Sequence, residues 1–160
     1  MKTKTSILFW GTPEFALPVL QALIDNKYEV AGVVTNPDQP AGRGENSTPP
    51  PARIFAQARN IPVYQFESIK GIKPSDLPPA DLYVVAAYGK IIPKEILEVP
   101  GLGSLVIHPS LLPQWRGPSP VQFSILKGDE KAGVTIIKMD EIMDHGPIVA
   151  SAKFKMQNLK

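Results

Sequence analysis

The chain has 160 residues, which is enough for one domain with a hydrophobic core and too few for two domains of ordinary size. Its formal net charge of +2 is too small to indicate nucleic-acid binding by charge alone. The absence of cysteine excludes disulfides and thiolate metal sites, and with only two histidines we expect no metal. The first apolar run is only four residues long, so we expect no signal peptide, no membrane partner and a cytoplasmic protein.

The first 35 residues predict a strand, a helix and a second strand. Residues 7–10 form a short apolar run, and Gly11, Thr12 and Pro13 follow it as a turn and a helix start. A helix over 13–26 would place Phe15, Val19, Ala22 and Leu23 on one face, and residues 28–35 return as a strand. Strand, helix and strand in this order imply a right-handed crossover and a parallel sheet. A dinucleotide site is a weak reading, because the Gly-x-Gly-x-x-Gly pattern is absent.

Residues 36–51 are the most irregular part of the sequence, with five of the 18 prolines and one basic residue, Arg43. A loop of this length inside a compact domain is usually functional or mobile, and a surface excursion without a function is the plainer reading. A short helix over 52–60 and a short strand over 61–64 follow, and residues 65–80 read as a loop.

In the second half of the sequence, polar loops follow apolar strands. Residues 81–87 read as a central parallel strand, followed by a loop over 88–93 and a short helix to 99. Residues 104–107 read as a strand that ends at His108, and the prolines at 109 and 113 restrain the loop after it. A helix over 119–127 and strands over 133–138 and 146–154 complete the chain. We expect the strand-end loops to meet at one edge of a parallel sheet.

Four segments together resemble one enzyme family. They are Phe-Trp-Gly-Thr-Pro-Glu-Phe-Ala at 9–16, Thr-Asn-Pro-Asp at 35–38 with Gly-Arg-Gly at 42–44, His-x-Ser-Leu-Leu-Pro at 108–113 with Arg-Gly at 116–117, and Gly-Val-Thr at 133–135 with Met-Asp-x-x-Met-Asp-x-Gly-Pro-Ile at 139–148. In this order, over about 7–152, they resemble the methionyl-tRNA formyltransferases. The histidine and Asp-x-Gly segments are shared with the wider folate-dependent formyltransferase family, which includes glycinamide ribonucleotide and sugar-nucleotide enzymes.

The resemblance implies an α/β, Rossmann-like formyltransferase fold, with a mostly parallel sheet and helices on both faces. It implies a single catalytic domain over 1–160, truncated relative to the family, and we expect a monomer. The implied co-substrate is 10-formyltetrahydrofolate or another reduced folate, the implied acceptor is charged initiator tRNA, and Arg43 would contact the tRNA. The implied catalytic residues are His108 and Asp144. The implied folate-binding residues are Tyr88, Gly89, Lys90, Ile91, Ile92, Ser110, Leu111, Leu112, Pro113, Met139, Asp140 and Met143.

These residue types suit the implied chemistry. Formyl transfer to an amine passes through a tetrahedral oxyanion, which needs positioned donors, and a proton must leave the attacking amine. His108 can donate to the formyl oxygen, and the Asp144 carboxylate can orient the ring and relay a proton through water. We expect His145 to face elsewhere, since neighbours on an extended segment point to opposite sides. Read without the resemblance, His108 is equally a structural histidine before a surface loop.

Two departures from the family pattern affect this interpretation. The family has Asn-x-His, and this chain has Val106 two residues before His108, on the same face of the strand and with no donor. Loss of one oxyanion donor costs about 10²–10³ in rate, Ser104 lies too far back to replace it, and Gln114 is a possible substitute. The sequence also stops before the last part of the family's catalytic domain and lacks its C-terminal tRNA-binding domain.

Three hypotheses remain open. The first is formyl transfer to methionyl-tRNA, slowed by Val106, and the near-complete motifs make it the leading one. The second is another folate reaction on the same fold, such as dihydrofolate reduction. Formyl transfer to a small amine, such as an amino sugar nucleotide, is a further alternative to the first. The third is a folate- or tRNA-binding module without catalysis. Val106 favours the second and third, whereas His108 and Asp144 favour the first and second.

Overall fold

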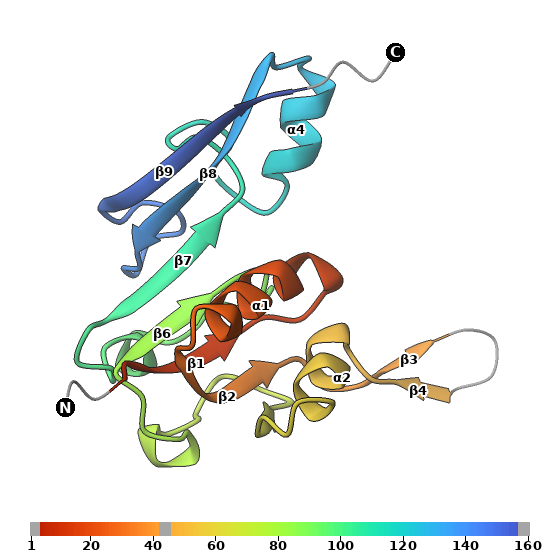
Figure 1. The fold of residues 1–160 in the computed structure, drawn as a ribbon, viewed down its shortest axis with the longest axis vertical. Coiled ribbons are helices and arrows are strands. Elements are labelled where there is room, and N and C mark those ends of the chain that lie inside the picture. Colours follow the sequence, from red (N-terminus) through yellow and green to blue (C-terminus); the bar gives the residue numbers. More distant parts are fainter. Residues whose placement is uncertain (1–3, 42–45, 157–160) are drawn as a thin grey trace. The chain divides into compact units, whose positions relative to one another are not determined.

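The computed structural model describes residues 4–41 and 46–156 (Figure 1). The chain divides into two compact units, residues 1–104 and 105–160, and each is described by itself. Among the described residues, no helix combines the length and apolar character that a membrane span requires.

The first unit is a parallel α/β sheet. Its strands lie in the order β5–β2–β1–β6, and every neighbouring pair is parallel, as expected. Its main elements are β1 (Ser6–Trp10), η1 (Glu14–Ala16), α1 (Leu17–Asp25), β2 (Glu29–Thr35), α2 (Pro51–Gln57), β5 (Val63–Gln65), η2 (Pro74–Asp76), β6 (Leu82–Val85) and α3 (Lys94–Leu97).

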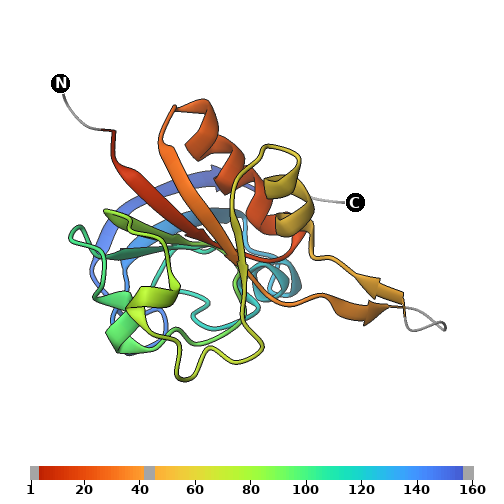
Figure 2. The ribbon, with the colours of Figure 1, turned by 90° about the horizontal axis from the view of Figure 1, so that it is seen from below.

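Both faces of this sheet are covered. The connections from β1 to β2 and from β2 to β5 step toward one edge, whereas the connection from β5 to β6 steps back. Right-handed crossovers therefore place α1 and α2 on one face and η2 on the other, as Figure 2 shows. Burial on both faces explains why residues 7–10 of β1 are apolar throughout and almost completely buried.

The first helix differs from the prediction in its start and its buried face. It begins as the 3₁₀ turn η1 and becomes α-helical only at Leu17. The change of helix type shifts the phase of the side chains, so Ala16 and Leu20 are buried while Phe15 is 58% exposed. The predicted face was therefore wrong at Phe15 and also at Ala22, which is exposed.

The segment expected to be an irregular loop contains a β-hairpin. β3 (Gln39–Ala41) pairs antiparallel with β4 (Asn46–Thr48), and the two strands project from the rest of their unit (Figure 1). A two-stranded ribbon leaves one side of each strand unpaired, so it can accommodate Pro40. Arg43, the expected tRNA contact, lies outside the described residues.

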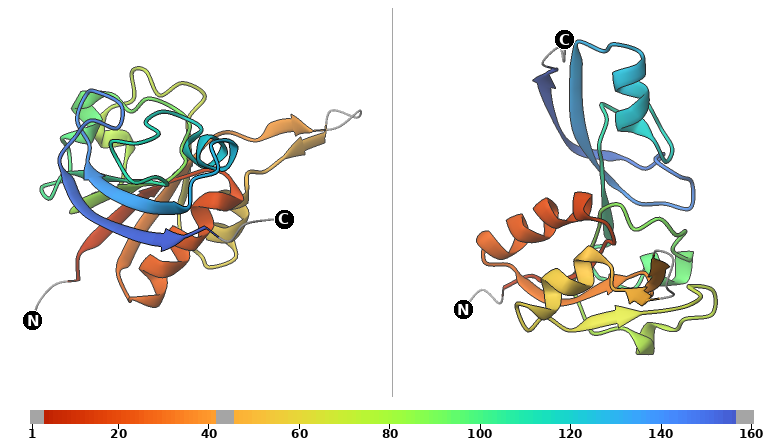
Figure 3. Two further views of the ribbon diagram at one scale, coloured as in Figure 1. Left: turned by 90° about the horizontal axis from the view of Figure 1, so that it is seen from above. Right: turned by 90° about the vertical axis from the view of Figure 1, so that its right-hand side faces the viewer.

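The second unit is antiparallel, which corrects the expectation that all strand-end loops share one edge of a parallel sheet. It contains β7 (Ser104–His108) from Leu105 onward, α4 (Pro120–Leu126), β8 (Lys131–Lys138) and β9 (Ile148–Lys155). β8 pairs antiparallel with β7 and with β9, and α4 lies beside β8 (Figure 3). Because Leu105 pairs with Lys138, the loop after β8 starts at the beginning of β7 and not at its end.

Candidate functional site

His108 is the last residue of β7 and pairs with Thr135 of β8. Its side chain is buried, with 5% of the residue exposed. The ring nitrogen Nε2 lies 2.9 Å from the backbone carbonyl oxygen of Trp115, a position suited to donation from an N–H. The loop that follows β7 therefore returns to hold the histidine that begins it.

The structure brings the two predicted catalytic residues together. Asp144 Oδ1 lies 3.4 Å from His108 Nδ1, and the backbone N–H of Gly117 donates to Asp144 Oδ2 over 2.8 Å. The loop after β8 achieves this by folding back along the sheet. Gly146 closes that loop, since a Cβ there would lie 1.8 Å from the carbonyl oxygen of Lys138. Any side chain at position 146 would clash with the backbone.

The two contacts of His108 define what its ring can do. Nε2 lies at hydrogen-bonding distance from a carbonyl oxygen, whereas Nδ1 faces the Asp144 carboxylate at the longer distance of an ion pair. A ring N–H beside a carboxylate is a charge-assisted donor. This arrangement can stabilise an oxyanion and can pass a proton to or from a reacting group.

The structure places Val106 as the sequence predicts, two residues before His108 on the same face. Val106 pairs with Ile137 and His108 with Thr135, and both partners are buried on the covered face of β8. Ser104 cannot act as a substitute donor, because its buried hydroxyl donates to the carbonyl oxygen of Leu97 over 2.7 Å. The side of His108 that faces back along the strand therefore lacks the family's carboxamide.

The predicted folate residues Ser110, Leu111, Leu112 and Pro113 form a braced turn after β7. The hydroxyl of Thr135 donates to the carbonyl oxygen of Ser110 over 2.7 Å and accepts from the N–H of Leu112 over 3.1 Å. Leu111 packs against Gly133, where a Cβ would lie 2.4 Å from the Leu111 side chain. Sequence reasoning missed the brace at Thr135, because only the strand register reveals that this threonine lies opposite His108.

The predicted folate residues Met139, Asp140 and Met143 belong to the loop after β8. Asp140 pairs with His145, whose Nδ1 lies 3.0 Å from Asp140 Oδ2, so His145 faces away from His108 as expected. The hydrogen bond with His145, followed by the one from the N–H of Ile142, holds the pKa of Asp140 below its ordinary value. Met143 is 60% exposed.

The remaining predicted folate residues, Tyr88, Gly89, Lys90, Ile91 and Ile92, lie in the first unit, after β6. The carbonyl oxygen of Tyr88 accepts a hydrogen bond from Asn36 Nδ2 over 3.1 Å, which fixes the start of the loop. Lys90 Nζ donates to two carbonyl oxygens of the loop after β5. Tyr88 and Ile92 are buried, whereas Ile91 is 78% exposed.

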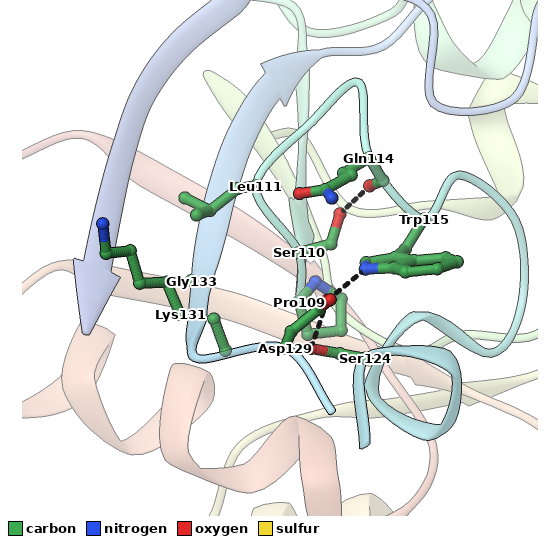
Figure 4. Close-up of a pocket in the computed structure, with 10 residues that line it drawn as sticks. Pro109, Ser110, Leu111, Gln114, Trp115, Ser124, Asp129, Lys131 and Gly133 are labelled. Carbon is green, nitrogen blue, oxygen red and sulfur yellow. Dashed lines mark hydrogen bonds between the residues drawn. The ribbon is translucent and has the colours of Figure 1, made fainter. Parts of the chain in front are cut away.

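Figure 4 shows a small cavity in the second unit, on the loop after β7. It has a volume of about 10 Å³, enough for roughly one water molecule and far too small for a pterin. The polar side chains that line it come from the loop, α4, the turn after α4 and β8, namely Ser110, Gln114, Ser124, Asp129 and Lys131. Within 4–41 and 46–156, no cluster of three or more histidine or acidic side chains could hold a metal ion.

Known proteins resemble this chain in fold and in sequence. Solved structures of phosphoribosylglycinamide formyltransferase from Anaplasma phagocytophilum and from Bacillus halodurans align with TM-scores of 0.73 and 0.71, at 19% and 22% identity. The alignments cover 99% and 97% of this chain and 76% and 82% of those proteins. They confirm the α/β formyltransferase fold.

Relatives that are closer in sequence are about twice as long as this chain. Methionyl-tRNA formyltransferase of Syntrophus aciditrophicus (strain SB) is 48% identical over 149 residues, which cover 91% of this chain and 48% of the relative. The enzyme of the same name from Bacillus licheniformis is 46% identical over 157 residues, which cover 96% of this chain and 49% of the relative. The chain thus spans about half the length of these curated relatives.

A family model described as "Formyl transferase" matches residues 3–158, which include β7 with His108 and the loop that carries Asp144. The match covers both units and nearly the whole sequence. Together with the fold and the pairing of His108 with Asp144, it establishes that this chain belongs to the formyl transferase family.

Proposed function

We propose that the chain transfers the formyl group of 10-formyltetrahydrofolate to the amino group of methionyl-tRNA. The observation that carries this proposal is the pair formed by the buried His108 and the half-buried Asp144, 3.4 Å apart, in a chain of the formyl transferase family. The names of the relatives from Syntrophus aciditrophicus and Bacillus licheniformis support methionyl-tRNA as the acceptor. Because the chain spans half of those relatives, the acceptor is the part of the proposal that most needs testing.

In the proposed reaction, the acceptor amine forms a C–N bond to the formyl carbon, and the bond from that carbon to N10 of the folate breaks. The formyl oxygen carries negative charge in the tetrahedral intermediate, and an N–H of His108 stabilises it. The amine loses one proton and N10 gains one, so tetrahydrofolate leaves without oxidation or reduction. Asp144 holds the His108 ring and can relay the proton through water.

The contacts of His108 set a condition on this step. Both ring nitrogens already have protein acceptors, at 2.9 Å for Nε2 and 3.4 Å for Nδ1. To donate to a formyl oxygen, His108 must exchange or share one of these contacts. Hydrogen bonds of catalytic groups commonly rearrange when substrate binds, so the present geometry is compatible with the role.

The loops proposed to bind the folate have suitable side chains. Ile91 in one unit and Met143 in the other are large apolar residues that remain mostly exposed, at 78% and 60%. An exposed apolar side chain in either loop can contact the planar ring of a pterin. Their neighbours supply backbone groups for the polar edge of a pterin. The proposed folate site is the whole predicted set, Tyr88, Gly89, Lys90, Ile91, Ile92, Ser110, Leu111, Leu112, Pro113, Met139, Asp140 and Met143.

The test is incubation of the purified chain with 10-formyltetrahydrofolate and charged initiator tRNA, with separation of formylated from unformylated methionine. We expect slow formylation by the wild type and none by His108→Ala or Asp144→Ala. Parallel reactions with dihydrofolate and a nicotinamide cofactor, and with an amino sugar nucleotide, examine the alternative reactions. Turnover in either of those, with no formylation of tRNA, would contradict the proposal.

A separate variant tests the tRNA contact. Arg43→Ala should weaken turnover of charged tRNA and leave folate binding, measured by calorimetry, unchanged. Glu14→Ala, an exposed charge of the same unit at the start of the first helix, is the matched control and should leave both measurements unchanged. Equal turnover by Arg43→Ala and wild type would argue against Arg43 as the contact.

A further inference from the structure

One short segment supplies partners to both sides of His108. The carbonyl oxygen of Trp115 lies 2.9 Å from Nε2. Two residues later, the N–H of Gly117 donates to the Asp144 carboxylate, whose other oxygen faces Nδ1 at 3.4 Å. The position of residues 115–117 therefore determines where both acceptors of the histidine lie.

This segment has a backbone conformation that Trp115 does not favour. Trp115 has φ of 55° and Gly117 has φ of 97°, both in the left-handed region. Glycine adopts this region readily, but a bulky residue such as tryptophan does so only where the surroundings hold it. The carbonyl of Trp115 is thus kept near His108 by contacts of the tryptophan side chain.

The indole of Trp115 has two such contacts. Its Nε1–H donates to Asp129 Oδ2 over 2.6 Å, a short bond to a carboxylate. Its ring stacks on Phe123 of α4, with centroids 5.8 Å apart and planes 8° from parallel. Figure 4 shows the indole, Asp129 and Ser124 meeting on one side of the loop.

Asp129 is itself fixed in the turn between α4 and β8. Its Oδ2 also accepts from the hydroxyl of Ser124 over 3.0 Å, and its N–H donates to the carbonyl oxygen of Ser124 over 3.0 Å. A carboxylate held by a helix end can act as a fixed anchor for a loop. None of these hydrogen bonds joins the side chain of Asp129 or of Trp115 directly to His108.

We propose that Asp129 is a positioning residue for His108. Asp129 acts on the histidine through the indole of Trp115. By fixing that indole, Asp129 holds the Trp115 carbonyl at Nε2 and the Gly117 N–H at Asp144. The effect on turnover rests on the proposed formyl transfer, whereas the effect on the histidine ring does not.

The first experiment measures the ring of His108 in the full, unliganded chain by ¹⁵N nuclear magnetic resonance at fixed pH. The chain has two histidines, and His145, paired with Asp140, serves as an internal reference. We expect Asp129→Ala to shift the ring signals of His108 and leave those of His145 in place. Asp129→Asn keeps an acceptor oxygen for the indole and should restore most of the wild-type spectrum.

A second variant removes the same hydrogen bond from its other side, in case Asp129→Ala does not fold. Trp115→Phe removes the indole N–H but keeps a ring that can stack on Phe123, and it should shift the His108 signals in the same way. Asp25→Ala removes an exposed carboxylate that accepts from Gln21 in the other unit, and it should change nothing. Unchanged His108 signals in folded Asp129→Ala or Trp115→Phe would overturn the proposal.

Measurements of turnover test the positioning role of Asp129 separately from the proposed formyl transfer. Loosening of a catalytic group by about 1 Å can cost on the order of 10²-fold, so Asp129→Ala should lower kcat by roughly 10–100-fold. The KM for the acceptor should stay close to that of wild type. Shifted His108 signals in a protein whose wild type transfers no formyl group would support the positioning role and reject the function. Normal kcat in Asp129→Ala would overturn the inference.

Discussion

Val106 is the residue that most limits the proposed reaction. It lies on the face of β7 that presents His108, and valine has no hydrogen-bond donor. Val106→Asn should therefore raise formyl transfer, by at most the 10²–10³-fold that one oxyanion donor is worth. The gain will be smaller if the carboxamide is poorly oriented. Rates of wild type and variant with saturating folate and tRNA provide the measurement.

The stability of this variant has to be measured alongside its rate. Val106 is half-buried and pairs with the buried Ile137, so an asparagine amide without a partner there would cost at most about 1–3 kcal/mol. A double variant with His108→Ala should lose all of the gain, because the new donor assists a reaction that still needs the histidine. If folded Val106→Asn and wild type both fail to transfer a formyl group, another folate reaction becomes the better interpretation.

At the scale of elements, the base of the β3–β4 hairpin is tied to its unit by three side chains. Arg53 of α2 donates to Asp38 Oδ2 over 2.5 Å. Gln65 of β5 donates to Asp38 Oδ1 and to the carbonyl oxygen of Asn36, both over 2.9 Å. Arg53→Ala should therefore speed amide hydrogen exchange in β3 and β4 and leave β1 unchanged. Arg59→Ala, which removes another arginine contact near the end of α2, is the matched control.

The pH dependence of this network has a definite sign. The hydrogen bonds from Gln65 and then Arg53 hold the pKa of Asp38 below its ordinary value of 3.8. A carboxylate with a lowered pKa in the folded state stabilises that state above the ordinary pKa, and the contribution is lost as the pH falls further. The difference in exchange between Arg53→Ala and wild type should shrink as the pH falls below 3.8. An equally large difference at lower pH would contradict this role of Asp38.

At the scale of the whole molecule, two buried tyrosines set the response to alkaline pH. Burial raises the pKa of Tyr88 from 10.0 to about 12 and also raises the pKa of Tyr83. A raised pKa in the folded state contributes stability that is fully present below pH 10.0 and is lost as the pH rises toward 12. The free energy of unfolding, from urea titrations between these values, should fall less steeply in Tyr88→Phe than in wild type.

The same tyrosines predict an effect at neutral pH. Both hydroxyl groups are buried without a hydrogen-bond partner among the described residues. Phenylalanine removes such a group and keeps the ring, so Tyr83→Phe should be neutral or stabilising at pH 7. Tyr28→Phe, at a position that is 47% exposed, is the surface control. Clear destabilisation by Tyr83→Phe would show that its hydroxyl has a partner.

The sequence correctly predicted the elements whose side-chain pattern fits only one type of secondary structure. Residues 7–10 and 82–85 are apolar runs of strand length, and a parallel sheet covered on both faces requires such runs. His108 was identified from its place at a strand end, whereas its pairing with Asp144 came from the family resemblance. Neither spacing nor composition could have brought together two residues 36 positions apart.

Tertiary structure decided the features that depend on contacts between distant segments. The direction of β8 relative to β7, the hairpin at β3 and β4, and the brace from the Thr135 hydroxyl follow from hydrogen bonds between distant segments, which residue types alone do not specify. The link from Asp129 through Trp115 to His108 is of the same kind. Its residues have ordinary roles in the sequence, and only the folded loop joins them. The sequence by itself thus determined the strands of the main sheet, the polar residues that end them and the family, whereas the fold determined which of those residues support one another.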